Sequence, residues 1–218
     1  SKRFDLRASQ QELRKLKSFA APIRRLMHRP FDERWLFFHP SVVWSMSRPI
    51  AEQMRDGKNI ALVATRQVTR PQFEHVFVTT SMIEIKMCSH DRNTQIFPLF
   101  INDVPGAGCA NIATGAVKKL GSALGEPVFD ASTRDVASIA KLTPRLIFDY
   151  VYAILHAPAY RARYFEFLRS DFPRIPLTPT GDLFCALAVL GSELVSLHLL
   201  ESPSVGKALS TYGGPANP

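Results

Sequence analysis

The chain has 218 residues, of which 46% are hydrophobic and 21% charged, a composition that excludes an intrinsically disordered protein. Lysine and arginine (27) outnumber aspartate and glutamate (19), and the net charge of +8 favours a partner that carries phosphate groups. Three cysteines without a Cys-x-x-Cys spacing exclude a disulfide framework and the common zinc motifs, and they favour a reducing, intracellular compartment.

The N-terminal segment is basic and has a helical pattern. Residues 9–12 (Ser-Gln-Gln-Glu) have the spacing of a capping box, and apolar residues then recur at helical intervals. We therefore expect a helix from Ser9 and a second helical turn from Pro22 to about Met27. The first 34 residues hold ten basic and four acidic side chains, so most of the net positive charge lies here.

Strand-like runs follow, up to residue 101. Short segments rich in β-branched and aromatic residues predict strands, with one short helix from Ser47 to Gly57 among them. The expected strands are 34–39, 59–66, 74–79, 83–87 and 95–101. Pro98 in the last strand argues for a position at a sheet edge, because proline donates no hydrogen bond. We expect the Gly- and Pro-containing residues 102–111 to form a loop.

From residue 112 onward the pattern is helical. The expected helices are 112–124, 133–140, 143–156, 158–169 and a last one that follows Thr180 and ends near Glu201. Thr143-Pro144 is a helix start, with a capping side chain before a proline in the first turn. The apolar run Leu183–Leu200 contains Glu193, and a membrane span needs about 20 predominantly apolar residues. We therefore expect a buried core helix and no membrane partner.

These patterns together predict an α+β (mixed α/β) fold. A mostly antiparallel or mixed sheet forms a β-rich N-terminal half, and the C-terminal half is all-helical. We expect a basic helical linker to an upstream domain over 1–30, a domain over 31–201 and a flexible tail over 202–218. The domain is β-rich over 31–105 and helical over 106–201. Since the chain starts without methionine, we expect it to be a fragment of a longer protein.

Motifs that carry catalysis are missing from the sequence. It has no dinucleotide or phosphate-binding glycine motif, no Gly-x-Ser-x-Gly and no pair of histidines around a carboxylate. The six histidines are scattered, and we expect His156 and His198, both within apolar helical patterns, to be core or capping residues. We predict no catalytic and no metal-binding residues in this chain.

Several sequence blocks, taken in their order and spacing, resemble one family. They are Arg29–Trp35, Ala61–Gln67, His75–Thr79, Phe97–Phe100, Phe148–His156, Tyr160–Pro176 and Leu190–Leu200. Residues 28–201 resemble the C-terminal specificity (target-recognition) region of the single-polypeptide Type ISP restriction–modification enzymes and of related adenine-specific DNA methyltransferases. The resemblance implies a bacterial, cytoplasmic module that reads duplex DNA. It also implies that S-adenosylmethionine and catalysis belong to an upstream methyltransferase domain of the same polypeptide.

Polar residues at expected strand ends are the candidates for base contacts. They are Arg66, Gln67, Arg70, Arg92, Asn93 and Thr94. Arginine pairs with two acceptors of guanine, and asparagine or glutamine pairs with adenine, so these residue types can read base edges from a loop in the major groove. The alternative is that Arg66 and Gln67 stabilise the fold by hydrogen-bonding to loop carbonyls.

The N-terminal segment supplies candidates for phosphate contacts, namely Arg14, Lys17 and Arg25. The alternatives are a solvated basic face or a surface that docks on the methyltransferase domain. If docking is the main role, the chain is a structural module that packs on that domain without reading DNA.

Two aromatic blocks are expected to serve the fold. We predict that Trp35 is packed, beside a buried ion pair between Arg34 and Asp32. Four tyrosines at helical spacings are expected to lie mostly in the core and at helix contacts: Tyr150, Tyr152, Tyr160 and Tyr164.

Overall fold

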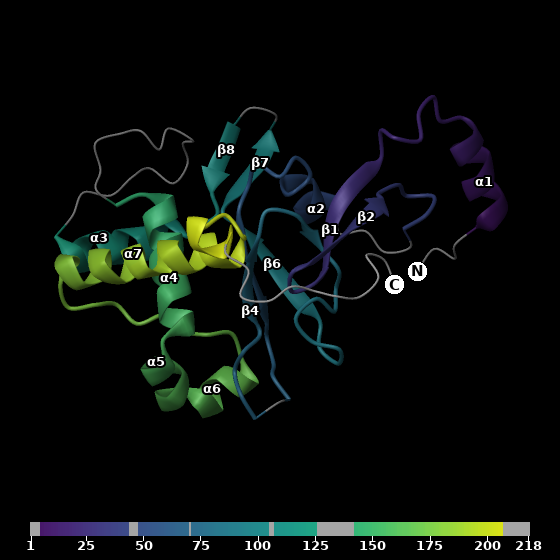
Figure 1. The fold of residues 1–218 in the computed structure, drawn as a ribbon. Coiled ribbons are helices and arrows are strands. Elements are labelled where there is room, and N and C mark those ends of the chain that lie inside the picture. The colour runs from purple at the N-terminus through teal and green to yellow at the C-terminus, as the bar shows by residue number, and fades with distance from the viewer. Residues whose placement is uncertain (1–4, 44–47, 70, 105–106, 126–141, 207–218) are drawn as a thin grey trace.

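The computed structural model describes residues 5–43, 48–69, 71–104, 107–125 and 142–206 (Figure 1). Its strands are β1 (Ile23–Arg29), β2 (Asp32–Phe37), β3 (Ala61–Thr65), β4 (Val76–Thr79), β5 (Met82–Ile83), β6 (Thr94–Pro98), β7 (Phe100–Val104) and β8 (Ala107–Ala110). Its helices are α1 (Leu6–Arg14), α2 (Arg48–Gln53), α3 (Thr114–Leu124), α4 (Pro144–His156), α5 (Pro158–Arg163), α6 (Phe165–Ser170), α7 (Gly181–His198) and a 3₁₀ turn (Pro203–Gly206). The α+β prediction is confirmed, with small sheets in the N-terminal half and helices in the C-terminal half.

Strand β3 is the central strand of a three-stranded sheet. It pairs antiparallel with β4 on one side and β6 on the other, in the order β4-β3-β6. Four of its five residues are buried, because both faces of the strand are covered, and this explains the uninterrupted apolar run in the sequence. β6 is an edge strand of this sheet, as Pro98 predicted.

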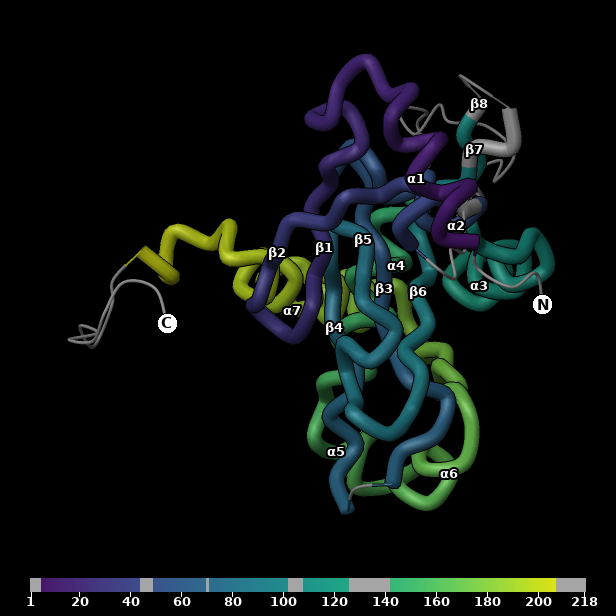
Figure 2. Tube along the Cα trace, turned by 90° about the vertical axis from the view of Figure 1, so that its right-hand side faces the viewer, coloured from purple at the N-terminus to yellow at the C-terminus, as the bar shows by residue number. Residues whose placement is uncertain are grey.

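Each face of the β4-β3-β6 sheet carries its own apolar layer. On one face, Ala64 and Val78 join the main core, which includes Val117 of α3, Tyr152 of α4 and Phe184 of α7. On the other face, a smaller cluster forms around the buried residues Met54, Ala61 and Met82. A second sheet, ordered β2-β1-β5, covers this side together with α2 (Figure 2). The sheet is therefore sandwiched between helices and a hairpin layer.

Helices α4 and α7 pack against each other at very short range. A Cβ atom built on Gly191 of α7 would lie 1.8 Å from the carbonyl oxygen of Asp149 in α4, so only glycine fits there. The Asp149 side chain is buried, and it accepts two hydrogen bonds from Arg145 Nε, each of 2.9 Å. Burial raises the pKa of Asp149, and the Arg145 guanidinium opposes this shift.

Helix α7 is packed on one side and open on the other. Phe184, Ala188, Gly191 and Val195 are its buried residues, whereas side chains such as Leu190 are exposed. The segment Gly181–Gly206 is long and apolar enough to cross a membrane by length and composition, and only 22% of its most apolar window is buried. The prediction of a buried core helix is therefore right for one face of α7 alone.

The N-terminal segment differs from its prediction. The helix is α1, which starts at Leu6 and is capped by Asp5, whose Oδ1 accepts a hydrogen bond of 3.0 Å from the Ala8 amide. The expected helical turn up to Met27 is wrong: residues 23–29 form β1, where pairing with β2 and β5 overrides the weak helical pattern. Because β1 pairs with β2 across residue 30, the expected boundary there cuts through a hairpin.

Four further elements were predicted with the wrong bounds or type. Of the expected strand 83–87, only Ile83 belongs to a strand, β5. The expected loop 102–111 contains the β7–β8 hairpin, and the expected strand 95–101 is divided at Leu99 into β6 and β7. The expected helix 158–169 breaks at Tyr164 into α5 and α6. The expected helix 133–140 and the end of the tail, 207–218, lie outside the described residues.

Candidate nucleic-acid interface

Two of the predicted polar segments meet in one pocket. Thr65, the last residue of β3, is paired with Thr94, the first residue of β6, so the segments beyond these residues emerge side by side. The resulting hollow, here called the strand-end pocket, has a volume of about 390 Å³ and is lined by Arg66, Gln67, Asp91, Arg92, Asn93 and Gln95. The antiparallel register thus joins residues that the sequence separates by more than 20 positions.

Arg66 is held by an exposed ion pair. Its Nε donates a hydrogen bond of 2.8 Å to Oδ1 of Asp171, at the end of α6. The pKa of Asp171 is lowered first by a hydrogen bond from the Phe172 amide and then by Arg66. Since both side chains of the pair are more than half exposed, the pair contributes little to stability and Arg66 can exchange Asp171 for another anion. The partner is a carboxylate, whereas a purely structural Arg66 was expected to bond loop carbonyls.

Asp91 ties the two sides of the pocket together. Its carboxylate accepts hydrogen bonds from Ser89 Oγ at 2.6 Å and from Thr69 Oγ1 at 2.7 Å. These two bonds, Ser89 first, hold the pKa of Asp91 well below its usual range, so it is ionised at neutral pH. Thr69 follows β3 and Ser89 precedes β6, so the contact fixes one loop against the other.

The remaining residues of the strand-end pocket differ in how exposed they are and in whether their polar atoms already have a hydrogen-bond partner. Asn93 and Gln67 are exposed. Arg92 and Gln95 are half-buried, and the Arg92 Nε and Gln95 Oε1 atoms have no hydrogen-bond partner among the described residues. Thr94 is buried, and its Oγ1 accepts a hydrogen bond from the Cys88 amide, an arrangement that favours a structural role.

The other predicted residues lie elsewhere. Arg14 and Lys17 are exposed at and just after the end of α1, and Figure 2 shows α1 at the opposite end of the molecule from the loops that follow β3 and precede β6. Arg25 lies in β1 and pairs with Glu33 of β2. Arg70 is outside the described residues. The predicted site is therefore divided between at least two surfaces.

Sequence reasoning missed two features. Gln95 lines the strand-end pocket although it lies inside a strand, and only the register of β6 could have placed it there. The prediction of a packed Trp35 beside a buried ion pair is wrong, because Trp35 is 70% exposed and the Arg34–Asp32 pair is also exposed. Strand β2 is the edge of its sheet, and the side chain of Trp35 faces solvent there.

The chemistry open to the described residues depends on metal-binding groups and on the surroundings of His156 and His198. No group of three or more histidine, cysteine or acidic side chains with metal-binding geometry occurs in the part of the chain that the structure describes. His198 Nδ1 shares a hydrogen bond with the Tyr152 hydroxyl, and His156 Nδ1 lies 3.1 Å from Arg161 Nη2. Both imidazoles are half-buried and contact neighbouring side chains, so the predicted core role is borne out only in part.

Comparison with known proteins identifies the family. A family model described as the Type ISP C-terminal specificity domain matches residues 2–217. The comparison with curated proteins found no match.

Solved structures have the same fold. In a cryoEM structure of a DrdV–DNA complex, the match has a TM-score of 0.66 and 26% identity, and covers 88% of this chain and 17% of that one. The match to the ATP-dependent Type ISP restriction-modification enzyme LlaBIII bound to DNA has a TM-score of 0.62 and 19% identity, and it covers 89% of this chain and 12% of that one. The match to a nuclease-deletion mutant of the Type ISP enzyme LlaGI with a DNA substrate mimic has a TM-score of 0.59 and 21% identity, and it covers 85% of this chain and 14% of that one. The chain spans less than a fifth of each of these proteins.

Proposed function

Because the chain belongs to the family of Type ISP C-terminal specificity domains, we propose that it recognises a duplex DNA target by sequence and leaves catalysis to other parts of a longer enzyme. The observation that carries the proposal is the strand-end pocket, in which Thr65–Thr94 pairing brings together side chains of the types that read base edges. The DrdV and LlaBIII structures were determined with DNA, which supports the same assignment.

The pocket residues divide by role. Arg92, Asn93 and Gln67 supply the donors and acceptors that distinguish bases, with Gln95 beside them. Arg66 exchanges its exposed carboxylate partner for a phosphate or a guanine edge. Asp91 is a positioning residue, since its negative charge repels DNA while its two hydrogen bonds fix the loops. We expect Arg14 and Lys17 to contact phosphates of a longer duplex or to join the module to its neighbour.

The family membership also supports a proposal about the parent enzyme. We propose that an upstream methyltransferase domain of the same polypeptide contacts this module, binds S-adenosylmethionine and modifies adenine, and that the enzyme acts in the cytoplasm. We assign no cofactor to the residues of this chain, and Arg70, Arg92 and Asn93 are assigned to DNA rather than to catalysis.

A docking function is the second candidate. Helix α1 has no buried residue, and Leu6 within it is 62% exposed, so the described part of the chain leaves much of the helix surface uncovered. A helix with an exposed apolar side chain and a basic end fits a surface that covers a neighbouring domain. In that case the chain binds a methyltransferase domain without salt dependence and has no affinity for DNA.

Selection from a pool of random duplexes tests the proposal. We expect the chain to enrich a sequence motif, and the slope of log affinity against log salt to be about −0.9 for each phosphate contact. Arg92→Ala and Asn93→Ala should relax the motif, at a cost of about 1–3 kcal/mol for each lost base contact. Lys118→Ala removes one exposed charge on α3 and serves as the matched control, with the motif unchanged. Binding that enriches no motif at any salt concentration contradicts sequence recognition.

A further inference from the structure

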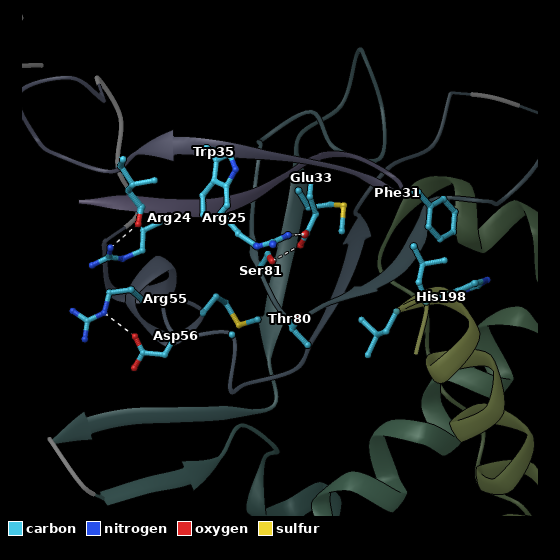
Figure 3. A pocket seen from close by; sticks show the side chains of 16 residues that line it. Arg24, Arg25, Phe31, Glu33, Trp35, Arg55, Asp56, Thr80, Ser81 and His198 are labelled. Atoms are coloured by element: carbon cyan, nitrogen blue, oxygen red, sulfur yellow. Dashed lines mark hydrogen bonds and ion pairs between the residues drawn. The ribbon is translucent and has the colours of Figure 1, made fainter. Parts of the chain in front are cut away.

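A second hollow lies under the hairpin formed by β1 and β2 (Figure 3). This hairpin cleft has a volume of about 770 Å³, within the range of ligand sites, and is separate from the strand-end pocket. Arg24, Arg25 and Trp35 line it from the hairpin, with Arg55 facing them and His198 at one end. Neither the predicted base contacts nor the strand-end pocket involves this surface.

Trp35 is the most exposed of the large hydrophobic residues that line the cleft. A tryptophan that remains 70% exposed loses the favourable free energy that burial of its large ring would supply. Such a side chain on an ordered strand, away from any described apolar cluster, is typical of a contact surface.

The orientation of the ring is fixed by a chain of contacts. The Arg25 guanidinium lies 4.9 Å from the centroid of the Trp35 ring and is paired with Glu33. Glu33 in turn accepts a hydrogen bond of 2.7 Å from Ser81, a buried residue next to β5. One face of the indole is therefore covered by a cation, and the exposed remainder is held ready for a planar partner with little further loss of side-chain freedom.

The charges around Trp35 favour an anion. Glu33 is neutralised by Arg25, and Asp56 is paired with Arg55. Arg24, in contrast, donates its hydrogen bonds to main-chain carbonyls, those of Ala21 and Ile23, at 2.6 and 2.7 Å. Its positive charge therefore has no carboxylate partner among the described residues. A planar ring and an uncompensated guanidinium that line the same cleft match a nucleotide, with the base on the ring and the phosphate on the cation.

We propose that the hairpin cleft binds an unpaired nucleotide of a DNA strand, with the base stacked on Trp35 and the phosphate at Arg24. The free face of an aromatic ring needs a free face of a base, which paired bases inside a duplex do not offer. This activity goes beyond the reading of paired bases at the strand-end pocket. Only the choice of DNA over RNA rests on the proposed function, whereas the choice of a nucleotide rests on the ring, the guanidinium and the net charge of +8.

Tryptophan fluorescence gives a direct test. The chain has two tryptophans, so Trp44→Phe leaves Trp35 as the single reporter. We expect a mixed-sequence single strand of about 12 nucleotides to quench its emission, and Trp35→Ala to weaken the affinity for this strand about tenfold or more. Trp35→Phe should keep most of the affinity, and Arg24→Ala should reduce both the affinity and its dependence on salt. Thermal melting checks that each variant is folded.

Matched controls separate this site from other surfaces. Phe167 of α6 is 74% exposed and lies outside the cleft, so Phe167→Ala should not change the affinity for single strands. Arg92→Ala should relax motif selection in duplex DNA and leave the quenching of Trp35 intact. Failure of duplex recognition and failure of the hairpin cleft are therefore observed separately.

Two outcomes overturn the proposal. In the first, a single strand produces no quenching and Trp35→Ala binds it as tightly as the parent chain does. In the second, single strands have no effect and Trp35→Ala abolishes self-association in sedimentation experiments, which assigns the cleft to a protein contact. Equal quenching by single-stranded RNA keeps the nucleotide site and overturns its assignment to DNA.

Discussion

The contact between α4 and α7 and the strand-end pocket show two opposite ways of placing side chains. At the helix contact, the backbones approach so closely that Gly191 has no room for a single additional carbon. At the pocket, residues are held by exposed ion pairs and hydrogen bonds between short loops. Close packing transmits every change to the whole fold, whereas exposed polar contacts allow one side chain to change while its neighbours stay. The comparison indicates that the helices maintain the fold and that the loops are free to vary in what they bind.

The largest expected effect is at the helix contact. Gly191→Ala places a Cβ atom against the Asp149 carbonyl oxygen, and we expect it to lower the free energy of unfolding by about 3 kcal/mol, the upper end of the usual cost of overpacking. Gly115→Ala in α3 is the matched control: apart from the helix's own nearby backbone, no atom of the described residues lies within 4 Å of the added carbon, and a gain of up to about 1 kcal/mol is expected. Urea denaturation measures both, and equal stabilities would refute the contrast.

A smaller effect concerns the half-buried histidines of these two helices. Burial first, and then the charges of Arg161 and His198, lower the pKa of His156 from an ordinary value near 6.5 to about 4. The unfolded chain therefore binds the proton more readily between these values. We expect the contribution of neutral His156 to the free energy of unfolding to be complete above pH 6.5. This contribution is lost as the pH falls toward 4.

Denaturation midpoints at several pH values test this dependence. His156→Gln should show a weaker loss of stability between pH 6.5 and 4 and keep the part due to His198, whose pKa burial also lowers. His90→Gln, at an exposed position, is the control and should follow the parent chain. A variant at residue 156 with an unchanged pH profile would show that another group is responsible.

The smallest expected effect on stability is at the strand-end pocket. Arg66→Ala removes an exposed ion pair, so the free energy of unfolding should hardly change. Asp171→Asn breaks the same pair and leaves the guanidinium available. If Arg66 contacts DNA, the first variant weakens duplex binding and the second retains or strengthens it. Two variants that weaken binding equally would indicate that the ion pair serves only to position the loop.

The sequence predicted the fold class and most strands and helices, because these depend on local apolar patterns. It predicted the family as well, because the order and spacing of several sequence blocks carry that resemblance. It also predicted that Arg66-Gln67 and Arg92-Asn93 lie at strand ends. It did not predict β1, whose pairing with β2 and β5 is a long-range choice, nor the break of α5 from α6 at Tyr164. The exposure of Trp35 was missed because an edge strand and a central strand look alike in a short aromatic run.

The carboxylate of Asp91 has a consequence for how new specificities arise. It accepts a hydrogen bond from Thr69, in the segment after β3, and one from Ser89, in the segment before β6. A recombination event or an engineered graft that replaces one segment without the other leaves an ionised side chain facing a mismatched partner. We therefore expect an exchange of segments between homologues to keep both hydrogen bonds only when it transfers the two segments together, although about 20 residues of chain separate them.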